Sequence, residues 1–262
     1  MLRIFLCQRA TTEAKGNKVL NQHTTLQKSS LTRLREEVLE ANLELVRRGL
    51  VLYTFGNASG IARDEALVVI KPSGVPYDKM KPEHLVVSDL DGKIVEGELR
   101  PSSDLPTHLV LYRAFNDIGG VVHTHSEYAT AWAQARREIP CFGTTHADYF
   151  NGPVPVTEPM SKDEIAGDYE KNTGDAIVRL FRDRNAWSVP GVLVANHGPF
   201  TWGADVSAAA HNAVVLEAIS RMAFFTITIN AEADAIGKSL HDRHYFRKHG
   251  NNAYYGQKRE CK

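Results

Sequence analysis

The stretch GGVVHTHSEYATAWAQAR, residues 119–136, changes its residue pattern half-way along. The apolar run at 119–125 carries His123 and His125 at its end and predicts a buried strand. Residues 127–136 have apolar side chains at helical spacing and predict a helix. Because side chains at positions i and i+2 of a strand face the same side, the two histidines should point together. A strand that leads directly into a helix indicates an α/β fold.

The rest of the chain extends this pattern. Helices are expected at 32–50, 107–115, 164–184 and 205–229, with Gly49 and Asp205 as caps. Strands are expected at 66–70, 84–89 and 93–98, and residues 191–203 are expected to be a strand that runs into a glycine- and proline-bounded turn. The turn DLDGK predicts that the strands at 84–89 and 93–98 form a hairpin. Residues 54–60 and 71–78 are expected to be loops. Together these elements predict one α/β domain over residues 31–262, with a mostly antiparallel sheet covered by helices.

Composition excludes several classes of protein. The 262 residues contain 31 Lys and Arg and 31 Asp and Glu without a basic block, so we expect no nucleic-acid partner. The sequence has no apolar run of the roughly 20 residues that cross a bilayer, so we expect no membrane partner. Three scattered cysteines form no disulfide framework and favour a reducing, cytoplasmic location. Residues 1–30 are basic and aperiodic, which predicts a poorly ordered extension; a transit-like segment is the alternative.

Histidines and small polar residues mark the candidate sites. His197, in ANHGPF, also follows an apolar strand, and three neutral imidazoles from two neighbouring strands could bind zinc. Histidines that only support the core are the alternative. Ser102, Ser103 and Asp104 stand before a predicted helix, where free backbone N–H groups can bind an anion. Each of these features, taken alone, is also compatible with a plain cap or turn.

Several motifs resemble a known family. GNASG, IKPSGV, PSSDLPTH, VHTHSEYATAWAQA, GTTHADYF, VLVANHGPF and HYFRKHGNNAYYGQ are similar to the L-ribulose-5-phosphate 4-epimerases of the class II aldolase/epimerase superfamily. The resemblance runs from about Leu31 to Gln257. It implies a three-layer α/β/α sandwich with a central, mostly antiparallel sheet. It also implies a homotetramer with sites at the subunit interfaces and one Zn²⁺ per subunit, for which Mn²⁺ or another divalent ion is the alternative.

The resemblance also implies roles for individual residues. The metal ligands would be Asp104, His123, His125 and His197. The substrate-binding residues would be Gly56, Asn57, Lys71, Ser73, Gly74, Ser102 and Ser103. The catalytic acid and base would be Asp148 and Tyr255, with the tyrosine reaching into a neighbouring subunit. We expect a nearby cation, supplied by His244, Arg247, Lys248 or His249, to lower the pKa of Tyr255, and partial burial to raise the pKa of Asp148.

The activity implied is the interconversion of L-ribulose 5-phosphate and D-xylulose 5-phosphate in L-arabinose degradation. The inverted carbon, C4, carries no acidic proton, so a retro-aldol cleavage and re-addition is the expected route. Three alternatives stay open: a class II sugar-phosphate aldolase of the L-fuculose-phosphate type, a paralogous 4-epimerase of L-ascorbate or L-xylulose catabolism, and a non-enzymatic metal-binding module. Aldolases of this class carry a glutamate where this chain has Asp104, which favours the epimerase.

Overall fold

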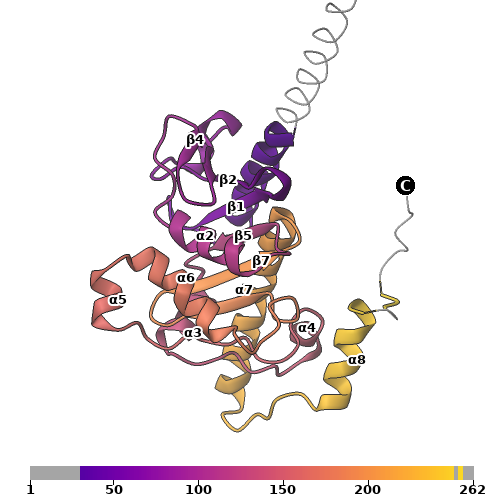
Figure 1. The fold of residues 1–262 in the computed structure, drawn as a ribbon. Coiled ribbons are helices and arrows are strands. Elements are labelled where there is room, and N and C mark those ends of the chain that lie inside the picture. Colours follow the sequence, from indigo (N-terminus) through magenta and orange to yellow (C-terminus); the bar gives the residue numbers. More distant parts are fainter. Residues whose placement is uncertain (1–29, 251–252, 256–262) are drawn as a thin grey trace, which may run out of the picture.

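The computed structural model describes residues 30–250 and 253–255. In this part of the chain one antiparallel sheet has the strand order β4-β3-β2-β1-β5-β7-β6 (Figure 1). Its strands are β1 (Asn57–Ala62), β2 (Leu67–Ile70), β3 (Val86–Asp89), β4 (Ile94–Glu96), β5 (Gly120–His123), β6 (Gly191–Val194) and β7 (Gly198–Gly203). The predicted N-terminal extension lies outside the described residues, except for residue 30, which is already helical.

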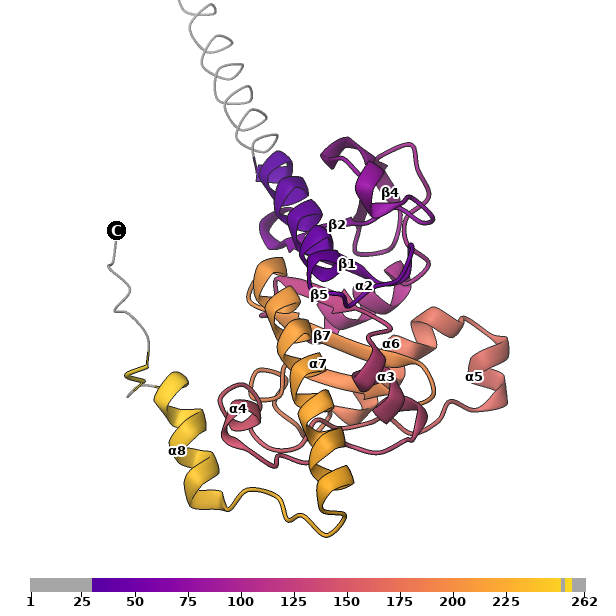
Figure 2. The same cartoon turned by 180° about the vertical axis from the view of Figure 1, so that it is seen from behind.

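Helices lie on both sides of the sheet, as the two opposite views show (Figures 1 and 2). They are residues 30–47, α2 (Leu105–Ala114), α3 (Glu127–Gln134), α4 (Thr144–Ala147), α5 (Lys162–Ala166), α6 (Tyr169–Leu180), α7 (Val206–Ile229) and α8 (Lys238–Lys248). Three short 3-10 helices, Arg63–Glu65, Tyr77–Lys79 and Pro82–His84, join the first strands.

Neighbouring strand residues enter two different cores. In β5, Val121 belongs to a larger core with α2 and β7, whereas Val122 belongs to a smaller core with the helix at 30–47 and the start of α7. Val68 and Val69 of β2 divide in the same way. This alternation is what a strand with helices on both faces requires. The predicted α/β fold with a helix-covered antiparallel sheet is confirmed.

Residues 54–60 are not all loop as predicted, because β1 begins at Asn57 and lies in the middle of the sheet. Its sequence NASGIA consists mainly of small residues, which are weak strand formers. They are needed because helices press closely on this part of the sheet. A Cβ on Gly60 would lie 2.8 Å from Leu34 Cδ1, and one on Gly120, its partner in β5, would lie 2.3 Å from Val206 Cα. Packing therefore overrides the local preference.

Two other predicted elements differ from the structure in part. Residues 191–203 begin with a strand and a turn as predicted, but the expected glycine and proline of the turn start a second strand, so that β6 and β7 form a hairpin closed by a three-residue turn in which Asn196 has φ +63°. The expected helix at 164–184 breaks at Gly167 and Asp168 into α5 and α6. The predicted β3–β4 hairpin is confirmed, with the Asp89 carboxylate accepting hydrogen bonds from two turn amides. The predicted cap of α7 is also confirmed, because Asp205 accepts from Ala208 N at 2.7 Å.

By length and composition alone, α7 could cross a bilayer. In this fold its first half is buried against β1, β5 and β7, and α3 packs beside it. Its second half leaves apolar side chains in solvent, among them Met222, Phe225 and Ile229, the last of which is 85% exposed. These side chains line a groove of about 440 Å³ together with Pro140 and Phe142.

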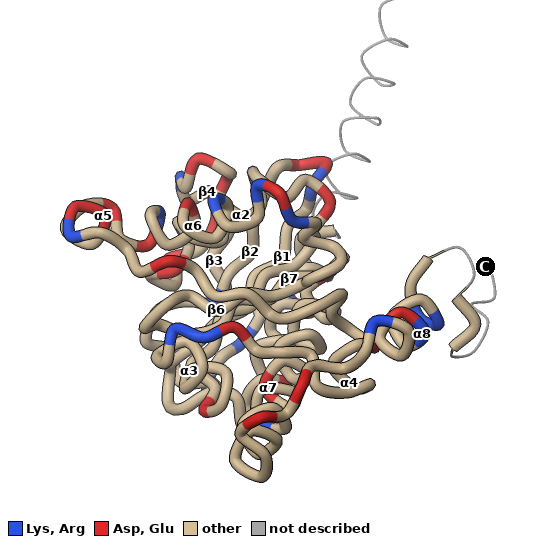
Figure 3. Tube along the Cα trace, turned by 90° about the horizontal axis from the view of Figure 1, so that it is seen from below, with Lys and Arg blue, Asp and Glu red and all other residues tan. Residues whose placement is uncertain are grey.

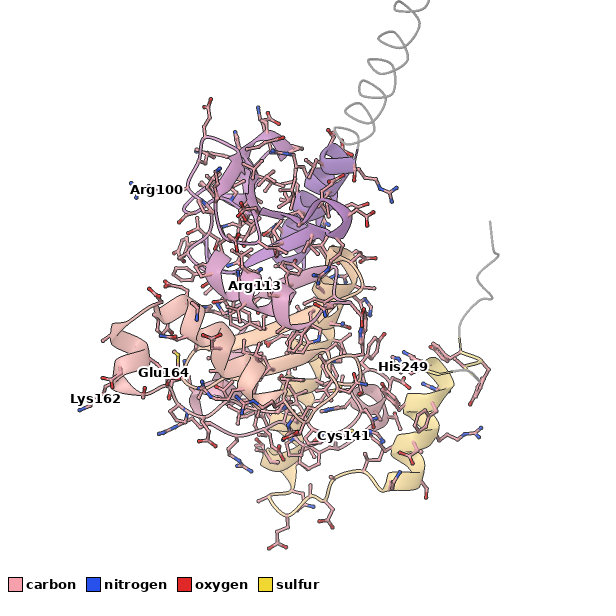
Figure 4. The ribbon with its side chains drawn as sticks, in the orientation of Figure 1. Arg100, Arg113, Cys141, Lys162, Glu164 and His249 are labelled. Carbon is pink, nitrogen blue, oxygen red and sulfur yellow. The ribbon has the colours of Figure 1, made fainter. Side chains whose placement is uncertain are left out.

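The polar tail, for which no element was expected, forms α8. This helix lies at the edge of the molecule, carries several Lys and Arg positions and ends at Lys248, with His249 as its C-cap (Figures 3 and 4). Its main contacts with the other described elements are with α4. Only His241 and Tyr245 of the helix are buried, so polar contacts account for much of its attachment.

Candidate active site

Three imidazoles meet where β5 and the β6–β7 hairpin end. His123 is the last residue of β5, where it pairs with Phe200 of β7, and His125 follows two residues later on the same side. His197 lies in the hairpin turn, which the left-handed conformation of Asn196 closes tightly. The three side chains each offer a ring nitrogen, and these nitrogens all lie within 4.8 Å of one another. The predicted convergence of the three rings is confirmed.

Fixed hydrogen bonds orient two of the rings. His123 Nδ1 lies 2.9 Å from the carbonyl oxygen of Pro199, and a carbonyl can only accept, so the proton is on Nδ1 and Nε2 presents a lone pair. The same ring stacks on Phe200, with centroids 4.2 Å apart. His197 Nδ1 lies 3.4 Å from the hydroxyl of Tyr169. Such partners behind a histidine are what holds a metal-ligating imidazole in place.

The chemistry of this group fits a divalent cation. Burial lowers the pKa of all three histidines, that of His123 to about 3, so the rings are neutral and can act as ligands at neutral pH. The Nε2 atoms of His123 and His125 are 3.0 Å apart. Two nitrogens bound to one tetrahedral ion at about 2.05 Å would be about 3.3 Å apart, which is close to that spacing. His125 is exposed, so an ion can enter from solvent.

Asp104 borders the three imidazoles without belonging to their cluster. It is the residue before α2, yet its carboxylate makes no capping bond to that helix. Instead it accepts a hydrogen bond of 2.6 Å from Asn57 Nδ2. Burial opposes its ionisation, but His123, His108 and the amide of Asn57 favour the carboxylate, and the pKa of Asp104 lies below its usual value. The residue is therefore an anionic ligand candidate beside the three neutral ones.

The wall of the cleft also contains groups that suit an anion. Lys71, directly after β2, has a buried side chain whose Nζ donates to the Thr54 carbonyl at 3.0 Å. Burial lowers its pKa to about 8, so it is still mainly charged at neutral pH. Ser73, Ser102 and Ser103 line the same cleft. A cation together with several hydroxyl groups can bind a phosphate.

Gly56 lets the backbone of this wall approach the metal ligands. It has φ +76°, and a Cβ there would lie 2.9 Å from the carbonyl oxygen of His123. The hydroxyl of Tyr77 donates to the carbonyls of Phe55 and Gly56, at 3.1 and 2.9 Å, and so fixes the loop. The amide of Asn57 faces Asp104, which leaves its buried Oδ1 without a partner among the described residues and available to a ligand.

Eleven of the thirteen residues proposed from the sequence line one cleft of about 370 Å³. They are Gly56, Asn57, Lys71, Ser73, Gly74, Ser102, Ser103, Asp104, His123, His125 and His197. The sequence interpretation missed Tyr169 and Glu170, which also line it. Both stand at the start of α6, and the Gly-Asp pair before them, which interrupts the expected helix, was the available signal.

Residues 36–224 match the family described as Class II Aldolase and Adducin N-terminal domain. The chain belongs to this family. Members of the family use a divalent metal, and the three-imidazole cluster is where this chain could bind one.

Solved structures of similar proteins agree with the assignment to the class II aldolases. An L-fuculose 1-phosphate aldolase is 25% identical, with a TM-score of 0.70 over 82% of this chain and 95% of that protein. YgbL from Klebsiella pneumoniae, named as a candidate aldolase/epimerase/decarboxylase, is 26% identical, with a TM-score of 0.66 over 81% and 98%. L-Fuculose 1-phosphate aldolase from Glaciozyma antarctica PI12 shares the fold at 14% identity, with a TM-score of 0.68 over 86% and 85%.

The two remaining residues proposed for this family member, Asp148 and Tyr255, lie together but not in the cleft. The guanidinium of Arg247 binds both oxygens of the Asp148 carboxylate, at 2.9 and 2.6 Å, and lies 4.6 Å from the ring centroid of Tyr255. His244 Nδ1 is 3.1 Å from the same carboxylate, and Lys248 Nζ is 3.6 Å away. All these cationic or basic groups come from α8, and His249 adds a bond of 2.9 Å to the Asp148 carbonyl.

The expected rise in the pKa of Asp148 is wrong. Burial does act to raise it, but the hydrogen bonds from Arg247 and His244 and the charge of Lys248 outweigh burial, so the pKa is lowered. The sequence analysis expected these basic residues to act on Tyr255 and did not pair them with Asp148. The structure shows that Arg247, His244 and Lys248 surround the Asp148 side chain within one chain, and Asp148 is therefore a carboxylate at neutral pH.

Proposed function

We propose that this protein is a zinc-dependent L-ribulose-5-phosphate 4-epimerase that works by retro-aldol cleavage and re-addition. The observation that carries the proposal is the shared cleft, which is lined both by three neutral imidazoles and by Lys71 with three serines. A sugar phosphate has matching ends, because its carbonyl and hydroxyl oxygens can chelate a cation while its phosphate binds the lysine and the serines. The family assignment supports sugar-phosphate chemistry of this type.

The reaction explains why both ends are needed. Inversion at C4 without an acidic proton requires that the C3–C4 bond breaks and forms again on the other face of the aldehyde. When bound, the divalent ion would act as a Lewis acid for the negative charge that develops on the substrate. Lys71, Ser73, Ser102 and Ser103 would hold the phosphate of the fragment, so that the aldehyde can turn without leaving the cleft. Asn57 Oδ1 can accept a hydrogen bond from a substrate hydroxyl.

Proton transfer at the C4 hydroxyl would come from a second copy of the chain. Asp148 and Tyr255 are close to one another but outside the cleft of their own chain. We infer a homotetramer in which the α8 end of one subunit completes the cleft of its neighbour. The exposed apolar half of α7 supports association, because uncovered apolar side chains of this size favour a protein interface. The few, scattered cysteines support the cytoplasm as the location.

The second candidate is a class II sugar-phosphate aldolase, which the similarity to an L-fuculose 1-phosphate aldolase favours. Both activities need the same bond cleavage, and Asp104 in place of a glutamate supports the epimerase. A paralogous 4-epimerase of L-ascorbate or L-xylulose catabolism would use the same chemistry on the same sugar.

A coupled assay separates these functions. Formation of D-xylulose 5-phosphate from L-ribulose 5-phosphate is measured on the metal-stripped chain, with and without added Zn²⁺ or Mn²⁺, for the wild type and Tyr255→Phe. We expect metal-dependent turnover that falls strongly in the variant. Cleavage of L-fuculose 1-phosphate without epimerisation would establish the aldolase instead. A chain that binds metal and turns over neither sugar would be a binding module.

A further inference from the structure

His108 is a fully buried imidazole in α2 that none of the roles above uses. Its Nδ1 lies 2.7 Å from Ser59 Oγ in β1, and its Nε2 has no hydrogen-bond partner among the described residues. Burial lowers the pKa of His108 to about 4, so the ring is neutral at neutral pH. A buried polar group without a partner costs roughly 1–3 kcal/mol, which an apolar side chain would avoid. Filling the core therefore does not account for a histidine at this position.

Three hydrogen bonds of similar length tie β1 to α2 and its N-cap residue. The first joins Asn57 to Asp104 at 2.6 Å, the second joins Ser59 to His108 at 2.7 Å, and the third joins Ser59 to Tyr112 at 2.8 Å. The partners in the first two bonds are two residues apart on the strand and four apart on the helix. These separations correspond to about 6.6 Å along a strand and about 6 Å along a helix, so both bonds can form at once.

The bond between Ser59 and His108 restricts movements of α2 that the bond between Asn57 and Asp104 alone would allow. With one attachment, α2 could rotate about its axis or slide along the strand, because apolar packing by itself tolerates small displacements. With two attachments, both movements are blocked. Ser59 Oγ also bonds the hydroxyl of Tyr112, which lies four residues after His108 in the same helix, at 2.8 Å. The buried hydroxyl of Ser59 therefore joins two successive turns of α2 to β1.

Asp104 would be the residue most affected by such a displacement. It stands at the start of α2, and its carboxylate is turned to Asn57 and the cleft rather than to the helix amides. By contrast, Asp205 at the start of α7 does cap its helix. A missing capping bond costs roughly 0.5–2 kcal/mol, so the orientation of Asp104 has to be maintained by other contacts.

The geometry points to His108 and Ser59 as positioning residues, whose hydrogen bond sets the rotation and depth of α2 and so directs the Asp104 carboxylate toward the three imidazoles. This inference rests on the proposed metal site. It assigns to the buried pair an effect on the affinity and geometry of that site, which a core histidine would not have.

Metal binding tests the inference without any assay of turnover. The chain is stripped of metal, its affinity for Zn²⁺ or Co²⁺ is measured by competition with a chromophoric chelator, and the absorption spectrum of the Co²⁺ form is recorded. His108→Leu fills the space but removes the bond to Ser59, and we expect affinity to fall at least about tenfold and the Co²⁺ spectrum to change. His108→Asn places an amide where Nδ1 was, and we expect it to restore most of the affinity.

The two variants make the positioning role distinguishable from a role in stability. Leucine fills the core better than asparagine, so a purely structural histidine predicts that His108→Leu is the milder change. Leu111→Ala, a fully buried change in the same helix, is the matched control: we expect a lower melting temperature with unchanged metal affinity. If His108→Leu does not fold, Ser59→Ala removes the bond to His108 together with the bond to Tyr112, and Tyr112→Phe, which removes only the latter bond, is its control.

Two results would overturn the inference. Wild-type metal affinity in His108→Leu or Ser59→Ala, with an unchanged Co²⁺ spectrum, would leave the buried pair without this role. Affinities that only follow melting temperature across all variants, including Leu111→Ala, would do the same. If the wild-type chain binds neither ion, the proposed function fails first, and the inference fails with it.

Discussion

The side-chain amide of Asn57 donates a hydrogen bond of 2.6 Å to the carboxylate of Asp104, across the gap between the central strand β1 and the start of α2. A carboxylate can only accept in this arrangement, so the orientation of the amide is determined. The bond to a charged acceptor is of the strong class and sets where the negative charge beside the three imidazoles lies.

Substitution of Asn57 should therefore impair the site in a graded way. Asn57→Ala removes a hydrogen bond to a charged group that contributes about 1.5–3 kcal/mol, so we expect kcat to fall about 10- to 150-fold. Asn57→Asp has the same shape but places two carboxylates together, and we expect a larger loss at pH 7. Steady-state kinetics with equal metal loading provide the measurement. Full activity in Asn57→Asp would show that the amide proton is not needed.

Substrate affinity should decline in alkaline solution because of Lys71. Burial lowers its pKa to about 8, so the charge that would hold a phosphate is lost as the pH rises through 8. We expect KM to rise above that pH. Lys71→Arg, whose guanidinium stays charged, should have a flatter alkaline profile, and Lys71→Met should have a high KM at every pH. An identical alkaline rise in Lys71→Arg would assign the titration to another group.

The lowered pKa of Lys71 also makes the free energy of unfolding depend on pH. Because the pKa of Lys71 is lower in the folded chain than its ordinary value of 10.5, the unfolded chain binds more protons between about pH 8 and 10.5. The contribution of Lys71 to the free energy of unfolding therefore rises with pH across that window and is constant below it. Urea unfolding of the wild type and Lys71→Met at pH 7 and pH 10 measures it; the difference between the two proteins should shift in favour of the wild type at pH 10.

Two glycines of the cleft should respond differently to an added methyl group. Both have positive φ, +76° at Gly56 and +69° at Gly74, but only Gly56 would bring its Cβ to 2.9 Å from the backbone of His123. Gly74→Ala should lose only the strain of its conformation, roughly 1–3 kcal/mol, with metal affinity retained. Gly56→Ala should lose more stability and metal affinity as well. Thermal unfolding and metal titration compare the two variants. Equal effects would show that the close approach of Gly56 to the backbone of His123 is not important.

The attachment of α8 should weaken in acid and on loss of Arg247. The pKa of Asp148 is lowered in the folded chain. Its ion pairs therefore stabilise the folded chain at neutral pH, and this stabilisation is lost as the pH falls through the pKa that Asp148 has in the folded chain. Arg247→Ala should release the helix at neutral pH, seen as faster amide exchange at Tyr245. Lys238→Ala, on an exposed pair of the same helix with Asp242, is the control and should leave exchange unchanged.

Chelation should remove activity but not the fold. The three imidazoles lie at the ends of β5 and the hairpin, above a core that is closed without them. We therefore expect unchanged circular dichroism after treatment with a chelator, and recovery of activity when the ion is returned. Unfolding on chelation would make the metal a structural element instead.

Much of the fold was predictable wherever residue preference and burial agree. β2, β3, β5 and α7 consist of residues that favour the structure they adopt, and Asp205 marks a helix start by direct chemistry. β1 was missed because close packing demands small side chains in a central strand. α8 was missed because its docking depends on Arg247 and Asp148, which are 99 residues apart, and no local pattern reports that.

The candidate site was predictable to the extent that its residues stand at strand ends. His123, His125 and His197 each follow an apolar run, and this pattern indicated that two neighbouring strands could place them together. Tyr169 and Glu170 were missed because the break in the helix before them was not predicted. The predicted rise in the pKa of Asp148 was wrong because burial was considered without the guanidinium that faces the carboxylate. Local pattern identifies chemically capable residues, whereas their charge state depends on partners distant in sequence.

The central position of β1 limits how this protein can be redesigned. One short segment both closes the hydrophobic interior and places Asn57 at the cleft, so changes there would alter folding yield and selectivity at the same time. Libraries that aim at new ligands should leave residues 57–60 untouched. Thr54, Phe55 and Glu170 line the same cleft and do not belong to β1. Randomising them would change which ligands enter the cleft while the stability of the fold is kept.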